Sequence, residues 1–139
     1  MGAALNQLAP APLKFIIRPL GTARGEAQFV KETTLKVRWP HRDGVTWRGW
    51  EAKCGPMVDE WMDSGRVAVA ESGGVIVGFA VWRDPRTLAM LYVKAGLRGN
   101  GFGLKLLADW PRDKVKVLQP TPCWRRWADH HGIAWEATA

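Results

Sequence analysis

Residues 91–107 read LYVKAGLRGNGFGLKLL, and they are the most informative part of the sequence for the architecture. It begins with an apolar run typical of a strand, passes through a short loop and enters a glycine-rich turn. The spacing of apolar residues then predicts a helix over residues 101–110. Glycines let backbone N–H groups point into one concavity, and a helix start adds positive potential there. The stretch therefore predicts a pyrophosphate site between strand and helix, with Arg98 adding charge.

Two common phosphate-binding loops do not account for this turn. The dinucleotide-binding fingerprint G-x-G-x-x-G/A is incomplete, because Leu104 and Lys105 follow the glycines, and no βαβ start precedes them. A Walker loop is excluded, because Lys105 does not stand in G-x-x-x-x-G-K-[ST]. In the helix after the turn we expect Leu104, Leu107 and Ala108 to face inward, and Pro111 to end it.

The rest of the chain predicts a mixed α/β domain of the α+β type. We expect strands at residues 14–20, 66–71, 75–82, 87–94, 114–118 and 133–136, and helices at 26–38, 51–63 and 122–131. Ser72-Gly73-Gly74 predicts a hairpin, and the nearly continuous apolarity of residues 75–82 indicates a strand covered on both faces. Residues 1–13 are expected to form a flexible lead-in to one domain over residues 14–139.

Length and composition limit the class of protein. The 139 residues are 47% hydrophobic and 24% charged, which is ordinary for one globular domain, and no apolar run reaches the length of a membrane span. The lack of a signal peptide and the two cysteines predict a soluble cytoplasmic protein, as monomer or homodimer. The net charge of +7 favours an acidic partner, either nucleic acid or a phosphorylated cofactor.

The order of these features resembles the acetyl-CoA-binding motif of the GCN5-related N-acetyltransferase (GNAT) superfamily. That motif runs from a hydrophobic strand through Val and a short loop to Arg-Gly-x-Gly-x-Gly and a helix with Leu-Leu. The corresponding residues here are Val93, Arg98, Gly99, Gly101, Gly103, Leu106 and Leu107. Ala95 departs from the motif, because many members carry proline there. The resemblance implies one domain with a mostly antiparallel sheet flanked by helices, and it extends more loosely over residues 14–136.

The resemblance also implies a cofactor and a reaction. The cofactor would be acetyl-CoA or another acyl-CoA, and the acyl group would pass to an unidentified amine by direct attack. Backbone groups of Leu91, Tyr92 and Val93 would hold the pantetheine arm, and a backbone N–H near Val93 would serve the oxyanion. The pyrophosphate would bind amides of the turn, which are those of Arg98, Gly99, Asn100, Gly101, Phe102, Gly103 and Leu104.

The residue that would protonate the leaving thiolate is not evident. The family's usual tyrosine falls on Ala128. The substitutes are Thr121 and Cys123, just past the strand at residues 114–118, and His41, in a loop that helps line the acceptor site in this superfamily. Each has a plainer interpretation: a turn residue for Thr121, a small buried residue for Cys123 and an exposed loop residue for His41. We expect no metal site.

Basic residues alternate with tryptophans in two segments, 36–50 and 124–127. Arginines contact phosphates and aromatic faces stack on unpaired bases, so these segments are candidates for the acceptor site. The candidate residues are Arg38, Trp39, Arg42, Trp47, Arg48, Trp50 and Arg125. The plainer interpretation is that the tryptophans pack in the core and the arginines are solvated.

Two other functions stay open beside the N-acyltransferase. One is a GNAT-type modifier of nucleic-acid bases, since the short, basic chain is similar in composition to small phage proteins of the Mom-like group. Under that alternative the chain would be a phage protein that modifies DNA bases. The other is a non-catalytic CoA-binding module, which Ala128 favours.

Overall fold

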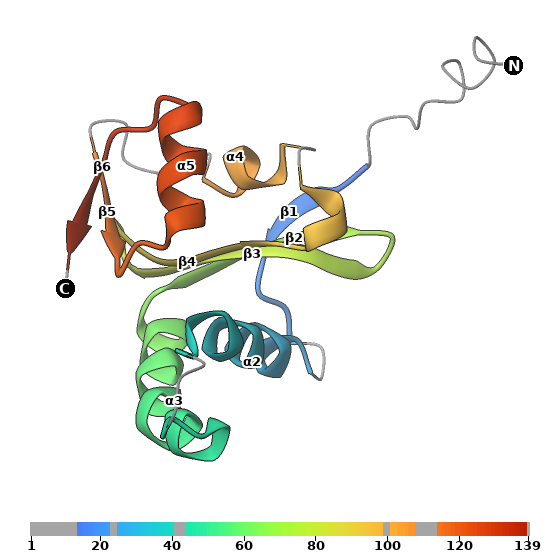
Figure 1. Ribbon diagram of the computed structural model, residues 1–139. Coiled ribbons are helices and arrows are strands. Elements are labelled where there is room, and N and C mark those ends of the chain that lie inside the picture. Colours follow the sequence, from blue (N-terminus) through green and yellow to red (C-terminus); the bar gives the residue numbers. More distant parts are fainter. Residues whose placement is uncertain (1–13, 23–24, 41–43, 99–100, 108–113, 139) are drawn as a thin grey trace, which may run out of the picture.

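The computed structural model describes residues 14–22, 25–40, 44–98, 101–107 and 114–138. Within these residues six strands form one mixed sheet with helices on both faces (Figure 1). The elements are β1 (Ile16–Pro19), α2 (Glu26–Arg38), α3 (Trp47–Ser64), β2 (Arg66–Ser72), β3 (Val75–Asp84), β4 (Thr87–Val93), the 3-10 turn η1 (Ala95–Leu97), α4 (Phe102–Leu106), β5 (Val115–Leu118), α5 (Pro122–His130) and β6 (Trp135–Thr138). The expected α+β class is confirmed.

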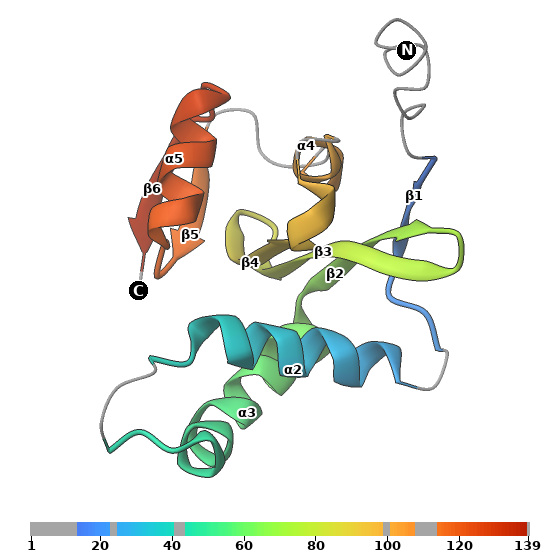
Figure 2. The same cartoon turned by 45° about the vertical axis from the view of Figure 1, so that its right-hand side comes forward.

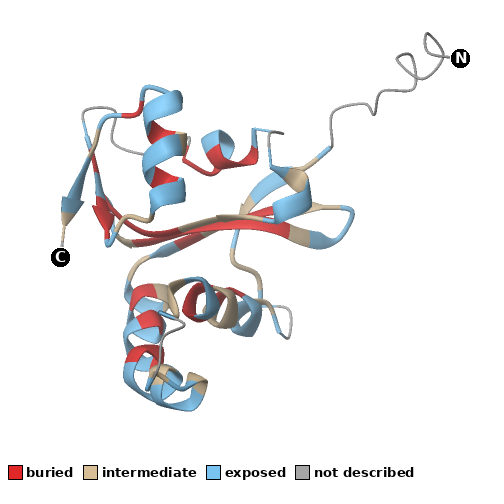
Figure 3. Cartoon of the chain, viewed as in Figure 1, coloured by how far each residue is buried: buried red, intermediate tan, exposed pale blue. Residues whose placement is uncertain are grey.

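The strands lie in the sheet in chain order, from β1 to β6. Strands β1 to β4 are antiparallel neighbours, whereas β4, β5 and β6 run parallel. The expected hairpin joins β2 to β3 through Gly73 and Gly74, which both have positive φ, as a tight turn between twisted strands requires. Strand β3 is buried along most of its length, as its apolar sequence predicts (Figure 3).

Each face of the sheet carries its own apolar core. Helices α2 and α3 cover one face, where Leu35, Trp61 and Phe79 belong to one buried cluster. Helices α4 and α5 cover the other face, where Phe102 and Trp124 belong to a second. The sheet is therefore the middle layer of three, and residues of one strand contribute alternately to the two cores.

Helix α3 differs from its expected span of 51–63. It begins at Trp47, because the Thr46 side chain caps it by accepting a hydrogen bond of 3.1 Å from the Gly49 N–H. Pro56 does not break it. Its ring lies on the exposed side of the helix, where water can satisfy the carbonyl that loses its partner.

Two further expectations are corrected at the second core. Leu104 is 42% exposed, because α4 turns Phe102 and Leu106 inward; Leu107 is buried as expected, and Ala108 and Pro111 lie outside the described residues. The last strand begins at Trp135 rather than residue 133, since the Ile133 N–H instead closes the end of α5 on the Ala128 carbonyl. In the part of the chain described, no helix combines the length and apolar character of a membrane span.

Candidate functional site

The sheet opens between β4 and β5. Within the described residues these strands pair only at Thr87 with Lys116 and at Leu88 with Val117, although β4 continues to Val93 (Figure 2). Burial follows this separation, because residues 87–90 are buried and residues 91–93 only half-buried. From Ala89 onward, β4 therefore presents a backbone edge that β5 does not cover.

The other edge of β4 is held firmly by β3. Val93 pairs with Gly78, and a Cβ at Gly78 would lie only 2.8 Å from the Tyr92 carbonyl oxygen, so glycine permits the close approach of the strands. The register shifts where Val81 faces Met90, which leaves Ala89 as an extra residue on β4. The open edge thus begins at a bulge, and the predicted pantetheine residues Leu91, Tyr92 and Val93 lie along it. The Tyr92 ring stacks on Phe79 at 5.1 Å.

After this edge the chain forms the 3-10 turn η1, and α4 is the next helix. The Arg98 side chain is exposed and its Nε lies 3.4 Å from the Val93 carbonyl oxygen. Gly101 precedes α4 with φ +80°, a conformation that L side chains rarely adopt. Gly99 and Asn100 lie outside the described residues. The predicted pyrophosphate turn thus leads from the open edge into a helix.

Aromatic contacts fix the first turn of α4. Phe102 is buried and meets the Phe15 ring edge-on, with centroids 4.3 Å apart. A Cβ at Gly103 would lie 2.7 Å from Cζ2 of Trp127 on α5, so glycine is needed there for helix packing. Packing thus explains both the Phe102 side chain and the need for glycine at position 103, which leaves the backbone amides of the two residues as candidates for binding an anion.

The predicted catalytic residues differ in their surroundings, and only Thr121 has a contact that explains it without catalysis. The Thr121 hydroxyl caps α5 by accepting a hydrogen bond of 3.1 Å from the Trp124 N–H. Cys123 is exposed rather than buried, and its Sγ lies 3.7 Å from the Arg126 guanidinium. Ala128, at the position of the usual tyrosine, is fully buried in the second core. His41 lies outside the described residues, and among the described ones no three His, Cys, Asp or Glu side chains gather as a metal site.

The tryptophans of segment 36–50 pack the corner between α2 and α3. Trp50 Nε1 donates to the Leu35 carbonyl at 2.9 Å, and Trp39 Nε1 donates to that of Val45 at 3.1 Å. Trp47 is half-buried and meets the Trp39 ring at 5.6 Å. These indoles are therefore used mainly in packing. Arg42 lies outside the described residues.

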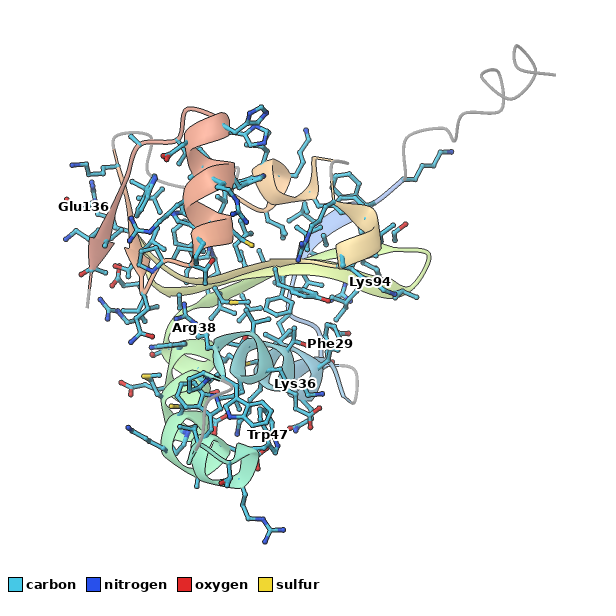
Figure 4. The ribbon with its side chains drawn as sticks, viewed as in Figure 1. Phe29, Lys36, Arg38, Trp47, Lys94 and Glu136 are labelled. Carbon is cyan, nitrogen blue, oxygen red and sulfur yellow. The ribbon has the colours of Figure 1, made fainter. Side chains whose placement is uncertain are left out.

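The arginines of the two segments have different surroundings. Arg48 is exposed at the start of α3, beside a groove of about 400 Å³ that lies between α2 and α3, away from the open edge. Arg125 is exposed on α5 and lies over the Trp135 ring, 5.2 Å from its centroid. Arg38, in contrast, turns inward from the end of α2 (Figure 4).

Arg38 contacts both strands at the opening. Its Nη2 donates to the carbonyl oxygens of Ala89 on β4 and Leu118 on β5, the latter at 2.9 Å. Its Nη1 lies 3.3 Å from the side-chain oxygen of Gln119. Burial lowers the pKa of the Arg38 guanidinium, which stays charged because its ordinary value is so high. Arg38 is thus committed to protein acceptors, which sequence reasoning missed.

Known proteins resemble this chain in part of its sequence and in its fold. Residues 56–116 match the family model described as the acetyltransferase (GNAT) domain, and no curated protein matches the sequence. A protein of Pyrococcus furiosus described as an acetyl transferase has a TM-score of 0.55 at 13% identity, covering 91% of this chain and 83% of its own. One of Deinococcus radiodurans R1, described as an acetyltransferase, reaches 0.55 at 16%, covering 94% and 88%. A GCN5-related N-acetyltransferase of Rhodopseudomonas palustris reaches 0.50 at 16%, covering 89% and 71%.

Proposed function

We infer that this chain is a GCN5-related N-acetyltransferase that transfers the acetyl group of acetyl-CoA to an amine, since residues 56–116 match the acetyltransferase (GNAT) domain model. The observation that supports this most is the open edge of β4 beyond Leu88, which is followed, after η1, by the glycine turn before α4. An extended arm can bond to an uncovered strand edge as an added strand would, and a glycine-rich helix start suits an anion. One continuous stretch thus offers both subsites.

Each part of the cofactor is assigned to one part of this stretch. The backbone of Leu91, Tyr92 and Val93 would hold the pantetheine arm along the open edge. The amides from Gly101 to Leu104 would hold the pyrophosphate, together with those of Gly99 and Asn100, which the motif places in the same turn. Arg98 would add charge at the junction of the two subsites.

The chemistry proposed is direct attack of the amine on the thioester. A neutral amine nitrogen forms a bond to the thioester carbonyl carbon, the carbon–sulfur bond breaks, and the sulfur leaves as a thiolate. The proton that the nitrogen loses passes to solvent, from which the thiolate is protonated. Ala128 offers no acid and the Thr121 hydroxyl caps a helix, so we assign the catalysis mainly to alignment of the two reactants, and His41 and the exposed Cys123 stay the candidates for supplying the proton instead of solvent.

We propose that the acceptor is an amine, and the sequence does not identify the molecule that carries it. A nucleic-acid base stays the alternative, supported by the net charge of +7 and by the exposed Arg48 and Arg125. The packing of Trp39 and Trp50 weakens it, because indoles bonded to backbone carbonyls are not available for base stacking. Binding of single-stranded DNA that weakens steeply with salt would favour the alternative.

Titration with acetyl-CoA tests the cofactor assignment. We expect the wild-type protein to bind acetyl-CoA with a micromolar dissociation constant, as measured by calorimetry. Arg98→Glu should weaken it by about tenfold or more, because it replaces a cation near the pyrophosphate by an anion. Gly101→Val should weaken it as well, since valine does not tolerate φ +80°.

The matched control is Lys36→Glu, which changes the net charge equally on the exposed side of α2. Its affinity should equal that of the wild type. Equal affinity of Arg98→Glu and wild type would reject the cofactor site, whereas an equal loss in both variants would show that net charge alone governs binding.

A further inference from the structure

Arg38 stands where the backbone ladder between β4 and β5 stops. The last pair joins Leu88 to Val117, and the next residue of each strand is Ala89 or Leu118. The carbonyl oxygens of these two residues both accept from Nη2 of Arg38. One side-chain nitrogen therefore links the strands at the position of the missing next rung.

This link supplies hydrogen-bond donors that are missing where the strands separate. Ala89 and Leu118 are buried, and a buried carbonyl needs a hydrogen-bond donor. Two strands that part cannot supply donors to each other, whereas the two hydrogens of one guanidinium nitrogen reach both carbonyls. The planar guanidinium is rigid, so the strand separation at this point follows from its geometry.

A third contact extends the link to the turn after β5. The Gln119 side chain accepts from Nη1, and the Gln119 backbone has φ +46°. Among the described residues, Gln119 alone combines a side chain with positive φ. Such a conformation persists only where its surroundings hold it in place, and Arg38 is one of them.

The charge of Arg38 makes this link costly as well as stabilising. No carboxylate of the described residues pairs with Arg38, whose guanidinium lies 5.8 Å from the Trp61 ring centroid. Its Nε atom is buried without a hydrogen-bond partner. A half-buried charge without a counter-ion is costly to fold, which is typical of a residue kept for function.

We propose that Arg38 is a positioning residue for acyl transfer, because it fixes the width of the β4–β5 opening and hence the alignment of amine and thioester. This rests on the N-acetyltransferase function proposed above. Arg38 neither gains nor loses a proton when the amine attacks the thioester. It acts through Ala89, Leu118 and Gln119. None of these three residues belongs to the pantetheine or pyrophosphate subsites, which lie between residues 91 and 104.

Arg38→Met and Arg38→Lys test this, with Lys36→Met as the control on the same helix. Methionine keeps the apolar stem without donors, and lysine keeps the charge but cannot bond to both carbonyls in a fixed plane. With the amine that the wild type uses best, thiol release should show kcat lower by about 100-fold for Arg38→Met, while KM for acetyl-CoA changes less than about threefold. Hydrogen exchange of the Leu118 and Gln119 amides should become faster in both Arg38 variants.

The outcomes separate this proposal from the function on which it rests. If Arg38→Met does not fold, Arg38→Lys decides, and it should lose at least about tenfold in kcat. Wild-type kcat in Arg38→Lys, or unchanged exchange at Leu118 and Gln119, would overturn the positioning role while acetyl transfer stands. A wild-type protein that binds no acetyl-CoA would instead reject the proposed N-acetyltransferase function. Faster hydrogen exchange at Leu118 and Gln119 in the Arg38 variants would still establish that Arg38 links β4 to β5.

Discussion

The antiparallel and parallel halves of the sheet are held together differently. Strand β2 pairs with β3 along its whole length, from Arg66 to Ser72, and β3 continues to pair with β4 up to Val93. In contrast, β4 and β5 share two pairs and then separate, with Arg38 bonded to both strands at the opening. We therefore call the antiparallel half, β1 to β4, the frame, and the proposed site lies where β4 and β5 separate.

The difference follows from how each half is connected. A two-residue turn joins β2 to β3, so pairing between them brings together residues that are close in sequence. Parallel strands need a crossover, and here α4 lies in the one between β4 and β5. A crossover allows neighbouring strands to part, which a tight hairpin does not.

The largest expected effect is at Gly65, in the antiparallel half. A Cβ there would lie 1.8 Å from the Trp82 carbonyl oxygen and 2.6 Å from that of Trp61. Both atoms belong to the backbone, so the frame itself must shift. We expect Gly65→Ala to lower the free energy of unfolding by about 3 kcal/mol or more, measured by urea denaturation.

The control for Gly65 is Gly96→Ala, in η1, where a Cβ would meet open space. Its unfolding free energy should stay within about 0.5 kcal/mol of the wild type. A Gly65→Ala protein as stable as Gly96→Ala would contradict the assignment of the antiparallel half as a rigid frame.

A smaller effect is expected at Gly103, on the parallel side. A Cβ there would meet Trp127 Cζ2 at 2.7 Å, which is a side-chain atom and can move. We expect Gly103→Ala to cost about 1–3 kcal/mol, and to weaken acetyl-CoA binding because the first turn of α4 shifts. Trp127→Leu in the same chain should restore part of both losses. Strictly additive losses in the double variant would refute the proposed contact.

The frame could be predicted from sequence because its signals are local. The helix at residues 26–38 was predicted to the residue, and Gly73-Gly74 identified the hairpin. Errors arose where one contact overrides a pattern. The Thr46 cap begins α3 earlier than its apolar spacing indicates, and the packing of Phe102 leaves Leu104 exposed.

The site could be predicted only in part, for a related reason. The glycine motif is contiguous, so the sequence placed Arg98 and Gly101 beside the end of a strand. The acceptors of Arg38 lie 51 and 80 residues away in the chain, and no spacing rule connects them. Sequence reasoning therefore placed Arg38 with the acceptor, whereas its guanidinium bonds to the strands.

The smallest expected effect concerns pH and again compares the two halves. Arg18, on β1, lies 2.8 Å from Glu26 on α2, and the Gly21 N–H donates to the same carboxylate oxygen at 3.1 Å. The Arg18 hydrogen bond, followed by that of Gly21, lowers the pKa of Glu26 from its ordinary value of 4.5. Since the folded protein binds this proton less readily than the unfolded chain, the stabilisation is complete above pH 4.5 and is lost as pH falls through the lowered pKa.

We therefore expect Tm to fall more steeply below pH 4.5 in the wild type than in Glu26→Gln, as measured by calorimetry at several pH values. Glu136→Gln is the control in the parallel half, where the carboxylate lies 3.5 Å from Lys114 and both side chains are about half exposed. An exposed pair contributes little, so this variant should follow the wild-type curve closely. If Glu26→Gln also follows that curve, the Arg18–Glu26 pair does not stabilise the contact between β1 and α2, and β1 is held by its pairing with β2 and by the Arg18–Glu71 pair.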